Sequence, residues 1–197
     1  MHPNRKFHIV DREAMADFVR EQGFGTLVAN TDEGLRAVHV PLRLDGDRLG
    51  FHVSKGNLIH RALMSGGEAL VVVNGAHAYI SPDWYGLEDR VPTWNYMAVE
   101  LEGIVRPLGP EALIRLLDDI SDHHEAKLTP KPIWKRGKMS DGRFEGLLKA
   151  ITGFEMHISG WRGTAKLDQD KPEEVRARLV EALEARGEHE MARIMRP

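Results

Sequence analysis

The segment from Phe51 to Arg61 concentrates side chains that bind anions. It supplies two imidazoles, a hydroxyl, an amide and two cations, in the residues His52, Ser54, Lys55, Asn57, His60 and Arg61. These residues fall where an alternating strand pattern gives way to a short helix, and the free N–H groups of a helix start favour an anion. The segment therefore predicts a phosphate site. An ordinary Ser or Asn helix cap beside solvated cations explains the same residues, so both interpretations stay open.

A second stretch with chemical character is rich in aromatic residues. The segments 74–85 and 91–96 contain all three Tyr residues of the chain and two of its four Trp residues. Thr93 and Asn95 add neutral hydrogen-bonding groups among them. An apolar platform with a few fixed polar groups is typical of a site for a planar ligand, whereas a packed aromatic core at one end of the fold is the alternative.

Metal chemistry is not expected, although the chain contains ten His residues. The densest cluster is His123-His124-Glu125, where adjacent side chains on a helix point about 100° apart and do not easily ligate one ion. The sequence lacks G-x-G-x-x-G, Walker A, G-x-S-x-G and H-E-x-x-H. It therefore assigns no metal ligand and no catalytic residue.

Composition predicts a soluble protein of the cytoplasm with one domain. The 197 residues carry a net charge of −3 and include 42% hydrophobic residues, enough for a sizeable core. The absence of cysteine excludes disulfides and thiolate chemistry and is compatible with a reducing compartment. No apolar run approaches the roughly 20 residues of a membrane span, so no membrane partner is expected.

Hydrophobic periodicity predicts a mainly β protein of the α+β class. A capped helix from Asp11 to Gly23 precedes a meander of strands, and further helices follow. Strands are expected at 25–30, 35–42, 48–54, 69–73, 96–106, 152–159 and 161–167, and helices at 58–64 and around Leu116, Leu147 and Leu179. Because no regular βαβ alternation occurs, a closed or split antiparallel barrel with peripheral helices fits best. We expect one domain over residues 1–197, with a helical extension from about residue 171.

Four sequence blocks then identify a resemblance that covers nearly the whole chain. They are His39-Val40-Pro41-Leu42, the run from His77 to Tyr85, the run from Val91 to Tyr96, and Gly153-Phe154-Glu155. These blocks resemble those of the PaiB family of FMN-binding negative transcriptional regulators. The resemblance implies a split β-barrel of the pyridoxamine-phosphate-oxidase type, assembled as a homodimer with FMN at the subunit interface.

The resemblance also implies which residues bind FMN. The second strand and the strand-to-helix junction would supply His39, His52, Ser54, Lys55, Asn57 and His60. Thr93, Trp94 and Asn95 would face the ring or the sugar-like chain, and Lys166 with Gln169 would reach across from a second subunit. The chain departs from the family pattern at Leu58 and Ala76, where Pro is usual, and at Asp168 and Asp170, where Ser and Asn are usual.

Two functions of different class follow from these residues. The first is a dimeric FMN-binding regulator, for which the segment from Lys131 to Arg143 offers five cations against one carboxylate. A solvated loop explains that charge run equally, and no helix-turn-helix is evident. The second is an FMN-dependent oxidoreductase that uses NAD(P)H, with His39 or His77 as a proton donor.

Overall fold

The computed structural model describes all 197 residues. By backbone contacts the chain divides into two compact units. The terminal unit comprises Met1–Met15, Asn74–Val99 and Arg162–Pro197, and the barrel unit comprises Ala16–Val73 and Glu100–Trp161. None of the helices combines the length and the apolar character that crossing a membrane requires.

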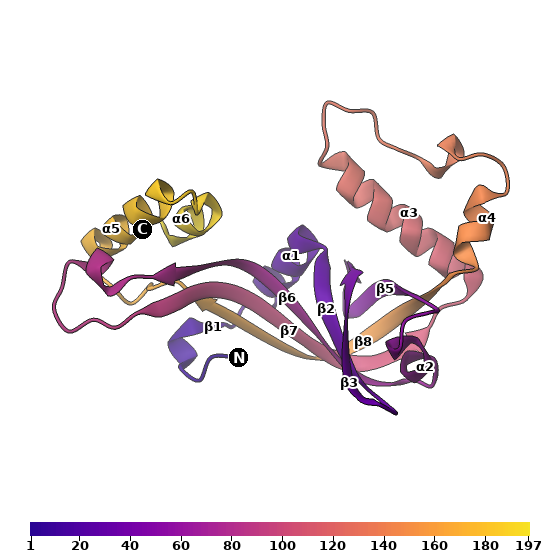
Figure 1. Cartoon of the computed structure of the whole chain (residues 1–197), viewed down its shortest axis with the longest axis horizontal. Coiled ribbons are helices and arrows are strands. Elements are labelled where there is room, and N and C mark those ends of the chain that lie inside the picture. Colours follow the sequence, from indigo (N-terminus) through magenta and orange to yellow (C-terminus); the bar gives the residue numbers. More distant parts are fainter. The chain divides into compact units, whose positions relative to one another are not determined.

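The barrel unit is built mainly from short antiparallel strands and the helices beside them (Figure 1). Its strands are β2 (Phe24–Thr31), β3 (Gly34–Pro41), β4 (Arg43–Asp45) and β5 (Arg48–Ser54), with parts of β6 (Gly67–Ile80), β7 (Thr93–Pro107) and β8 (Ile151–Lys166). Its helices are most of α1 (Arg12–Gln22), then α2 (Ile59–Met64), α3 (Pro110–Ala126) and α4 (Arg143–Leu148), with the 3-10 turn η3 (Arg136–Lys138). Hence the mainly β class is confirmed.

The sheet follows the order β3-β2-β6-β7-β8-β5-β4 and is not closed by hydrogen bonds between its two ends. Thus the split form of the expected barrel is the one observed. Pro41 ends β3, the first strand of this order, where a residue without an N–H group costs no ladder hydrogen bond. In β3, Val40 is buried and His39 is exposed, as alternation across the strand predicts.

Alternating apolar residues form the core of the barrel unit. In β5 the buried side chains are Leu49, Phe51 and Val53, which is a period of two. Phe51 is the register partner of Phe154 in β8, and the two buried rings stack with centroids 5.9 Å apart. This pair therefore fixes which face of β5 and β8 points inward.

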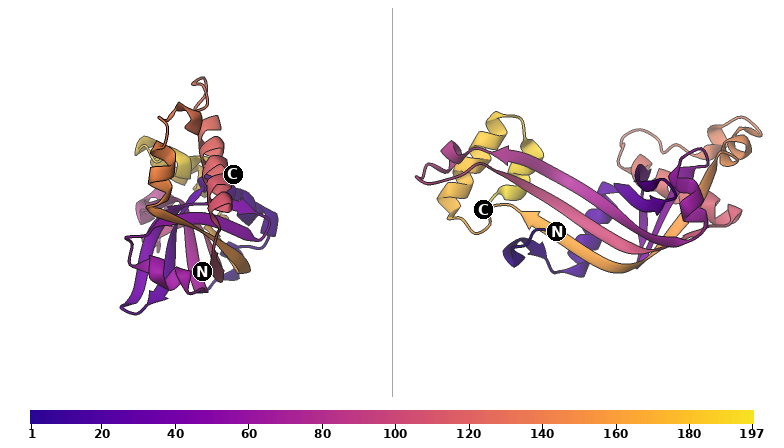
Figure 2. Two further views of the ribbon diagram at one scale, coloured as in Figure 1. Left: turned by 90° about the vertical axis from the view of Figure 1, so that its right-hand side faces the viewer. Right: turned by 60° about the horizontal axis from the view of Figure 1, so that its bottom comes forward.

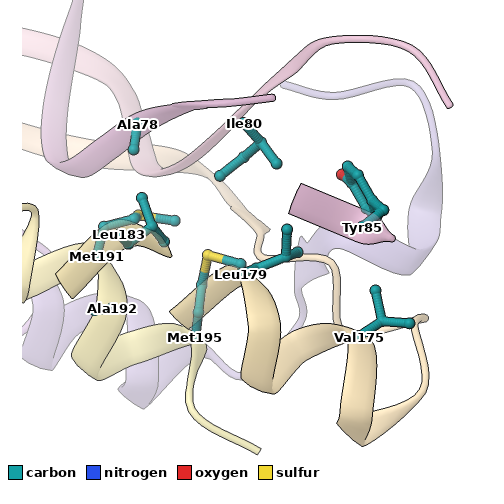
Figure 3. Packing of buried hydrophobic residues seen from close by; sticks show 9 residues of the cluster. All are labelled: Ala78, Ile80, Tyr85, Val175, Leu179, Leu183, Met191, Ala192 and Met195. Carbon is teal, nitrogen blue, oxygen red and sulfur yellow. The ribbon is translucent and has the colours of Figure 1, made fainter. Parts of the chain in front are cut away.

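The terminal unit contains both chain ends and the outer parts of three long strands. Besides these strands it holds η1 (Arg5–Phe7), β1 (His8–Ile9), η2 (Pro82–Tyr85), α5 (Glu173–Ala185) and α6 (His189–Met195). The helices α5 and α6 lie side by side near the end of β6 (Figure 2). Their apolar faces meet the strand and η2 in one cluster (Figure 3), formed by Ala78, Ile80, Tyr85, Val175, Leu179, Leu183, Met191, Ala192 and Met195.

Most helix boundaries agree with the sequence signals. The Asp11 carboxylate accepts hydrogen bonds from the backbone N–H groups of Glu13 and Ala14, and Gly23 follows α1 with a φ of +58°. Further along, Gly109 and Pro110 begin α3. The final helix α6, from His189, was not expected separately from α5, because its seven residues are too few for a clear periodicity.

Two strand predictions were wrong in extent. The expected strands at 152–159 and 161–167 are one continuous strand, β8, and the strand expected at 69–73 continues to Ile80. Gly160 does not mark a turn but lies where a side chain would collide with Glu102, since an added Cβ would be 2.4 Å from a carboxylate oxygen. In β6, Ala69, Val71 and Val73 are buried, and beyond Gly75 the buried residues are Ala78 and Ile80, so the strand alternation resumes there with the opposite phase.

Gly103 gives a test of how closely β7 and β8 pack. A Cβ at this residue would lie 2.0 Å from the His157 carbonyl oxygen. We expect Gly103→Ala to lower the free energy of unfolding by about 3 kcal/mol, because backbone atoms must move apart. Urea denaturation followed by circular dichroism measures this change. Gly137→Ala is the matched control, since a Cβ there has no neighbour within 4 Å; equal stability of both variants would contradict the packing argument.

Candidate functional site

An open pocket of about 750 Å³ lies at the junction of β5 and α2 in the barrel unit. One wall is the turn between β2 and β3, and the other is the junction with the first turns of α2. The lining residues are Asn30, Thr31, Asp32, Glu33, Lys55, Gly56, Asn57, Leu58, His60, Arg61, Ala62 and Ser65. Three of the residues expected to bind FMN, Lys55, Asn57 and His60, therefore lie together in one pocket.

Local hydrogen bonds shape this junction. The Asn57 side-chain oxygen accepts from the Ile59 N–H at 3.1 Å, and the Ser54 hydroxyl oxygen accepts from the Gly56 N–H at 3.4 Å. The Lys55 N–H donates to the Ala150 carbonyl at 2.9 Å, which fixes the base of the lysine beside β8. Since the Asn57 side-chain oxygen already accepts from the first N–H group of the six-residue helix α2, the cations rather than the helix end provide the attraction for an anion.

The charges of the pocket favour a bound anion. Lys55 and Arg61 are exposed, and neither has a carboxylate within ion-pair distance. Two carboxylates, Asp32 and Glu33, also line the pocket, but Glu33 is paired with Arg36 at 3.1 Å. Two unpaired cations therefore face one unpaired carboxylate, which leaves Lys55 and Arg61 available for a phosphate.

His60 forms the inner side of the pocket with defined contacts. Its Nε2 lies 2.9 Å from the Thr152 hydroxyl oxygen, and its ring meets Phe154 edge-on with centroids 5.9 Å apart. The imidazole is thereby held by β8 while the residue remains part of the pocket lining. While Nε2 keeps its contact with Thr152, only Nδ1 can bind a ligand. Nε2 becomes available to a ligand if that contact breaks.

Three other expected residues of the same set do not line this pocket: His39, His52 and Ser54. His39 is exposed on β3, with its Nδ1 3.0 Å from the Thr26 hydroxyl and its ring stacked near Phe24. His52 lies on β5 opposite Gly153, with a buried Nδ1 that has no hydrogen-bond partner. Burial lowers the pKa of His52 below its ordinary value.

The remaining expected residues meet in the terminal unit. The Lys166 ammonium donates to the Thr93 hydroxyl at 2.5 Å and to the Trp94 carbonyl at 2.7 Å. Burial lowers the pKa of Lys166, while the nearby Asp168 acts in the opposite direction. In this structure Lys166 therefore holds the start of β7.

Asn95 belongs to a buried polar cluster. It is 0% exposed, and its amide nitrogen donates to Asp168 Oδ2 at 2.7 Å. The Tyr85 hydroxyl donates to the same oxygen at 2.9 Å, and Asp168 has a φ of +53°. Burial, and then this hydrogen bond, raise the pKa of Tyr85. Asp168, which departs from the family pattern, thus has an internal structural role, and no sequence pattern indicated its pairing with Asn95.

The aromatic stretch divides between core and surface. Tyr85 is buried in the core of the terminal unit, whereas Tyr79 and Trp94 are 46% and 54% exposed. The Trp94 ring lies 5.7 Å from the His77 ring and 6.2 Å from the Tyr79 ring, measured between centroids. We call these three residues the aromatic surface. The core alternative therefore applies to Tyr85, and the aromatic surface is what is left for the ligand-site alternative, which stays a prediction.

The segment from Lys131 to Arg143 is less positive than its own sequence indicates. Lys131 pairs with Glu125, Lys135 with Asp122 at 2.6 Å, and Arg136 with Asp118 at 3.4 Å. All three carboxylates come from α3, which precedes the segment. A count of charges within 131–143 misses these partners because they lie outside it.

Arg61 is the residue that the family pattern did not assign and that the structure adds to the pocket. It lies within the anion-binding stretch of the sequence, six residues after Lys55. Asn30 and Thr31 join from the turn between β2 and β3. The pairing of β2 with β3 forms this turn, and the contacts of α2 with both strands, which no local pattern indicates, bring it to the pocket.

Fold and pocket together define a split-barrel protein with a pocket that contains two unpaired cations, and comparison with known proteins gives the family. Residues 1–160 match the family described as "Putative FMN-binding domain". The chain is 31% identical over 188 residues to the Protease synthase and sporulation protein PAI 2 of Bacillus subtilis, which covers 93% of this chain and 89% of that protein. The chain therefore belongs to the PaiB family of FMN-binding proteins, and FMN is its cofactor.

Solved structures agree with the fold. The FAD and heme binding protein from Mycobacterium smegmatis superposes with a TM-score of 0.61 at 19% identity, over 86% of this chain and 78% of that one. The flavocytochrome Anf3 from Azotobacter vinelandii gives a TM-score of 0.58 at 14% identity, over 83% and 72%. At these identities the likeness concerns the fold.

The buried imidazole of His52 predicts a loss of stability in acid. Its folded-state pKa lies below the ordinary value of 6.5, so the unfolded chain takes up the proton first. The contribution of His52 is therefore fully present above pH 6.5 and is lost as the pH falls through the folded-state pKa. We expect His52→Gln to lose less stability on acidification than the parent in urea titrations. An unchanged pH profile would contradict the assignment, and His39→Gln, an exposed imidazole, is the control.

Proposed function

We propose that this protein is a homodimeric negative transcriptional regulator of the PaiB type that binds FMN in the β5–α2 pocket. The observation that carries the proposal is the presence of two cations without carboxylate partners, Lys55 and Arg61, in that pocket. The resemblance to regulators of this family supports the proposed role in transcription. The absence of cysteine is compatible with action in the cytoplasm.

The pocket residues fit FMN by their chemistry and their space. Lys55 and Arg61 would hold the phosphate, with Arg61 offering a fork of donors and Lys55 a point charge. Asn57 and His60 would bind hydroxyls of the sugar-like chain. A volume of about 750 Å³ lies within the roughly 300–1,000 Å³ usual for small-ligand sites. FMN, when bound, would supply electron or hydride transfer, and the protein would orient it.

The aromatic surface supports the dimer. His77, Tyr79 and Trp94 present exposed rings on β6 and β7, and rings of this kind are enriched in protein interfaces. In the proposed dimer, Thr93 and Trp94 face the flavin ring or the sugar-like chain, and Lys166 with Gln169 reaches across from the second copy, as the resemblance implies. The hydrogen bond from the buried Asn95 to Asp168 would hold the backbone between Trp94 and Tyr96 in place.

A transcriptional regulator requires a surface that binds DNA or a protein partner. The segment 131–143 is the proposed DNA-binding surface. Three of its cations already pair with α3, so binding to phosphates would replace those ion pairs. Lys138 and Arg143 have no such partner and are immediately available. We therefore expect weak DNA binding with a strong dependence on salt concentration.

An FMN-dependent oxidoreductase that uses NAD(P)H is the second candidate. It is favoured by His39, whose exposed imidazole lies 3.0 Å from the Thr26 hydroxyl and could pass a proton to a substrate. His77, beside Trp94, is the other imidazole with this capacity.

Direct titration with FMN tests the pocket. We expect Lys55→Ala and Arg61→Ala each to raise the Kd for FMN about tenfold, because each removes a charged hydrogen bond to the phosphate. Flavin fluorescence measures binding, and sedimentation of the same samples gives the mass. Lys6→Ala is the control, because Lys6 is exposed and lies outside the pocket. Unchanged affinity in both pocket variants would remove this junction from the flavin site.

A second experiment separates the regulator from the oxidoreductase. The regulator predicts DNA binding that weakens with salt and falls on neutralising Lys135, Arg136 and Lys138 together. The oxidoreductase predicts bleaching of bound flavin by NAD(P)H without oxygen, and slower turnover in His39→Gln. Absence of both signals would exclude both mechanisms as stated.

A further inference from the structure

A smaller pocket lies on the other side of Lys55. Its volume is about 260 Å³, and it is an open pocket lined by the start of α3, the end of α4 and the start of β8. The lining residues are Lys55, Leu108, Pro110, Leu113, Leu148, Lys149, Ile151, Thr152 and Gly153. All belong to the barrel unit, and we call this space the lysine pocket.

The lysine pocket has apolar walls and two cations. Five of its residues, Leu108, Pro110, Leu113, Leu148 and Ile151, are apolar. Lys55 and Lys149 are exposed and have no carboxylate within ion-pair distance. Gly153 forms part of the floor, where a Cβ would lie 3.1 Å from Leu113 Cδ1. Apolar walls with a few placed charges are typical of a binding site rather than of a solvated surface.

The lysine pocket and the β5–α2 pocket share a wall. Lys55 lines both of them. Thr152, which lines the lysine pocket, contacts His60, which lines the other, through the 2.9 Å contact of hydroxyl and imidazole. The backbone of Lys55 is fixed to Ala150, so its side chain extends from one anchored point toward either space.

We propose that the lysine pocket binds a small carboxylate with an apolar body, such as an aromatic or branched aliphatic acid. The carboxylate would lie between Lys55 and Lys149, and the body would contact the leucines. A volume of about 260 Å³ is just below the roughly 300 Å³ at which drug-sized ligand sites begin, so the ligand is compact. Inorganic phosphate fits less well, because apolar walls offer its remaining oxygens no hydrogen bonds.

The shared lysine makes the two sites antagonistic. This step rests on the proposed placement of the FMN phosphate beside Lys55. One ammonium group then serves two anions, and each anion weakens the binding of the other. Linkage requires the effect to be reciprocal, so FMN reduces the affinity for the acid by the same factor as the acid reduces the affinity for FMN. The acid is then a signal that lowers flavin occupancy.

Binding of benzoate to the flavin-free protein tests the site itself. We expect saturable binding by calorimetry or by NMR shifts at Thr152 and Gly153. Lys149→Gln and Lys55→Gln should each weaken it roughly threefold to tenfold, as expected for a partly exposed charge pair. Lys6→Gln is the control. Benzamide, which lacks the charge, acetate, which lacks the apolar ring, and inorganic phosphate should each bind less tightly. No saturation, or equal binding of benzamide, would overturn the proposal.

Titration of FMN at saturating benzoate tests the antagonism. We expect the Kd for FMN to rise about threefold or more in the parent, and the benzoate concentration that produces half of this rise to be roughly threefold to tenfold higher in Lys149→Gln. Benzoate binding with no effect on FMN would overturn the shared role of Lys55 and leave the lysine pocket as an independent site. Benzoate binding by a protein that binds no FMN would instead contradict the proposed function.

Discussion

The pairing of β5 with β8 is the constraint on which both pockets depend. Seven residue pairs, from Arg48 with His157 to Ser54 with Ile151, bring together segments that are about one hundred residues apart in the sequence. The stacked rings of Phe51 and Phe154 hold the register, since a slip of β5 by one residue would turn the Phe51 ring to the opposite face of the sheet, away from Phe154. Immediately beyond the last pair, Lys55 bonds to Ala150 and the chain turns into α2. The position of Lys55 is thus set by the sheet.

Cations of the barrel unit differ in whether the fold supplies them with partners. Lys131, Lys135 and Arg136 each meet a carboxylate on α3, so their charges mainly attach the segment to that helix. Exposed pairs of this kind contribute little stability each. Lys55, Arg61 and Lys149 have no such partner and line pockets. The fold therefore separates cations that attach one segment to another from cations that face a pocket without a carboxylate partner.

The sequence predicted the class of fold well, and the junction for which it predicted a phosphate site does line a pocket, because both depend on local signals. Binding at this junction stays a prediction. Alternation in β5, the Asn57 cap and the Asp11 cap are patterns within a few residues. The continuity of β8 was missed, because a glycine such as Gly160 between two apolar runs commonly indicates a turn. In the folded chain a side chain at this position would collide with Glu102 of β7, and the sequence around Gly160 does not reveal that contact. Arg61 belongs to the anion-binding stretch of the sequence. Its place in the pocket lining depends on the turn at Asn30 and Thr31, which only folding brings close to α2.

The cluster around Asp168 has a consequence for how the chain folds during synthesis. Asn95 donates to Asp168 and also approaches the Met195 sulfur at 3.5 Å, while Tyr85 packs with α5 and α6. Residues of the barrel unit, through Trp161, leave the ribosome before Asp168 and the helices α5 and α6. The polar groups of Asn95 and Tyr85 therefore stay in water until Asp168 and the helices α5 and α6 have been synthesised, and a ribosome that stops before Met195 releases a chain whose terminal unit has no completed core.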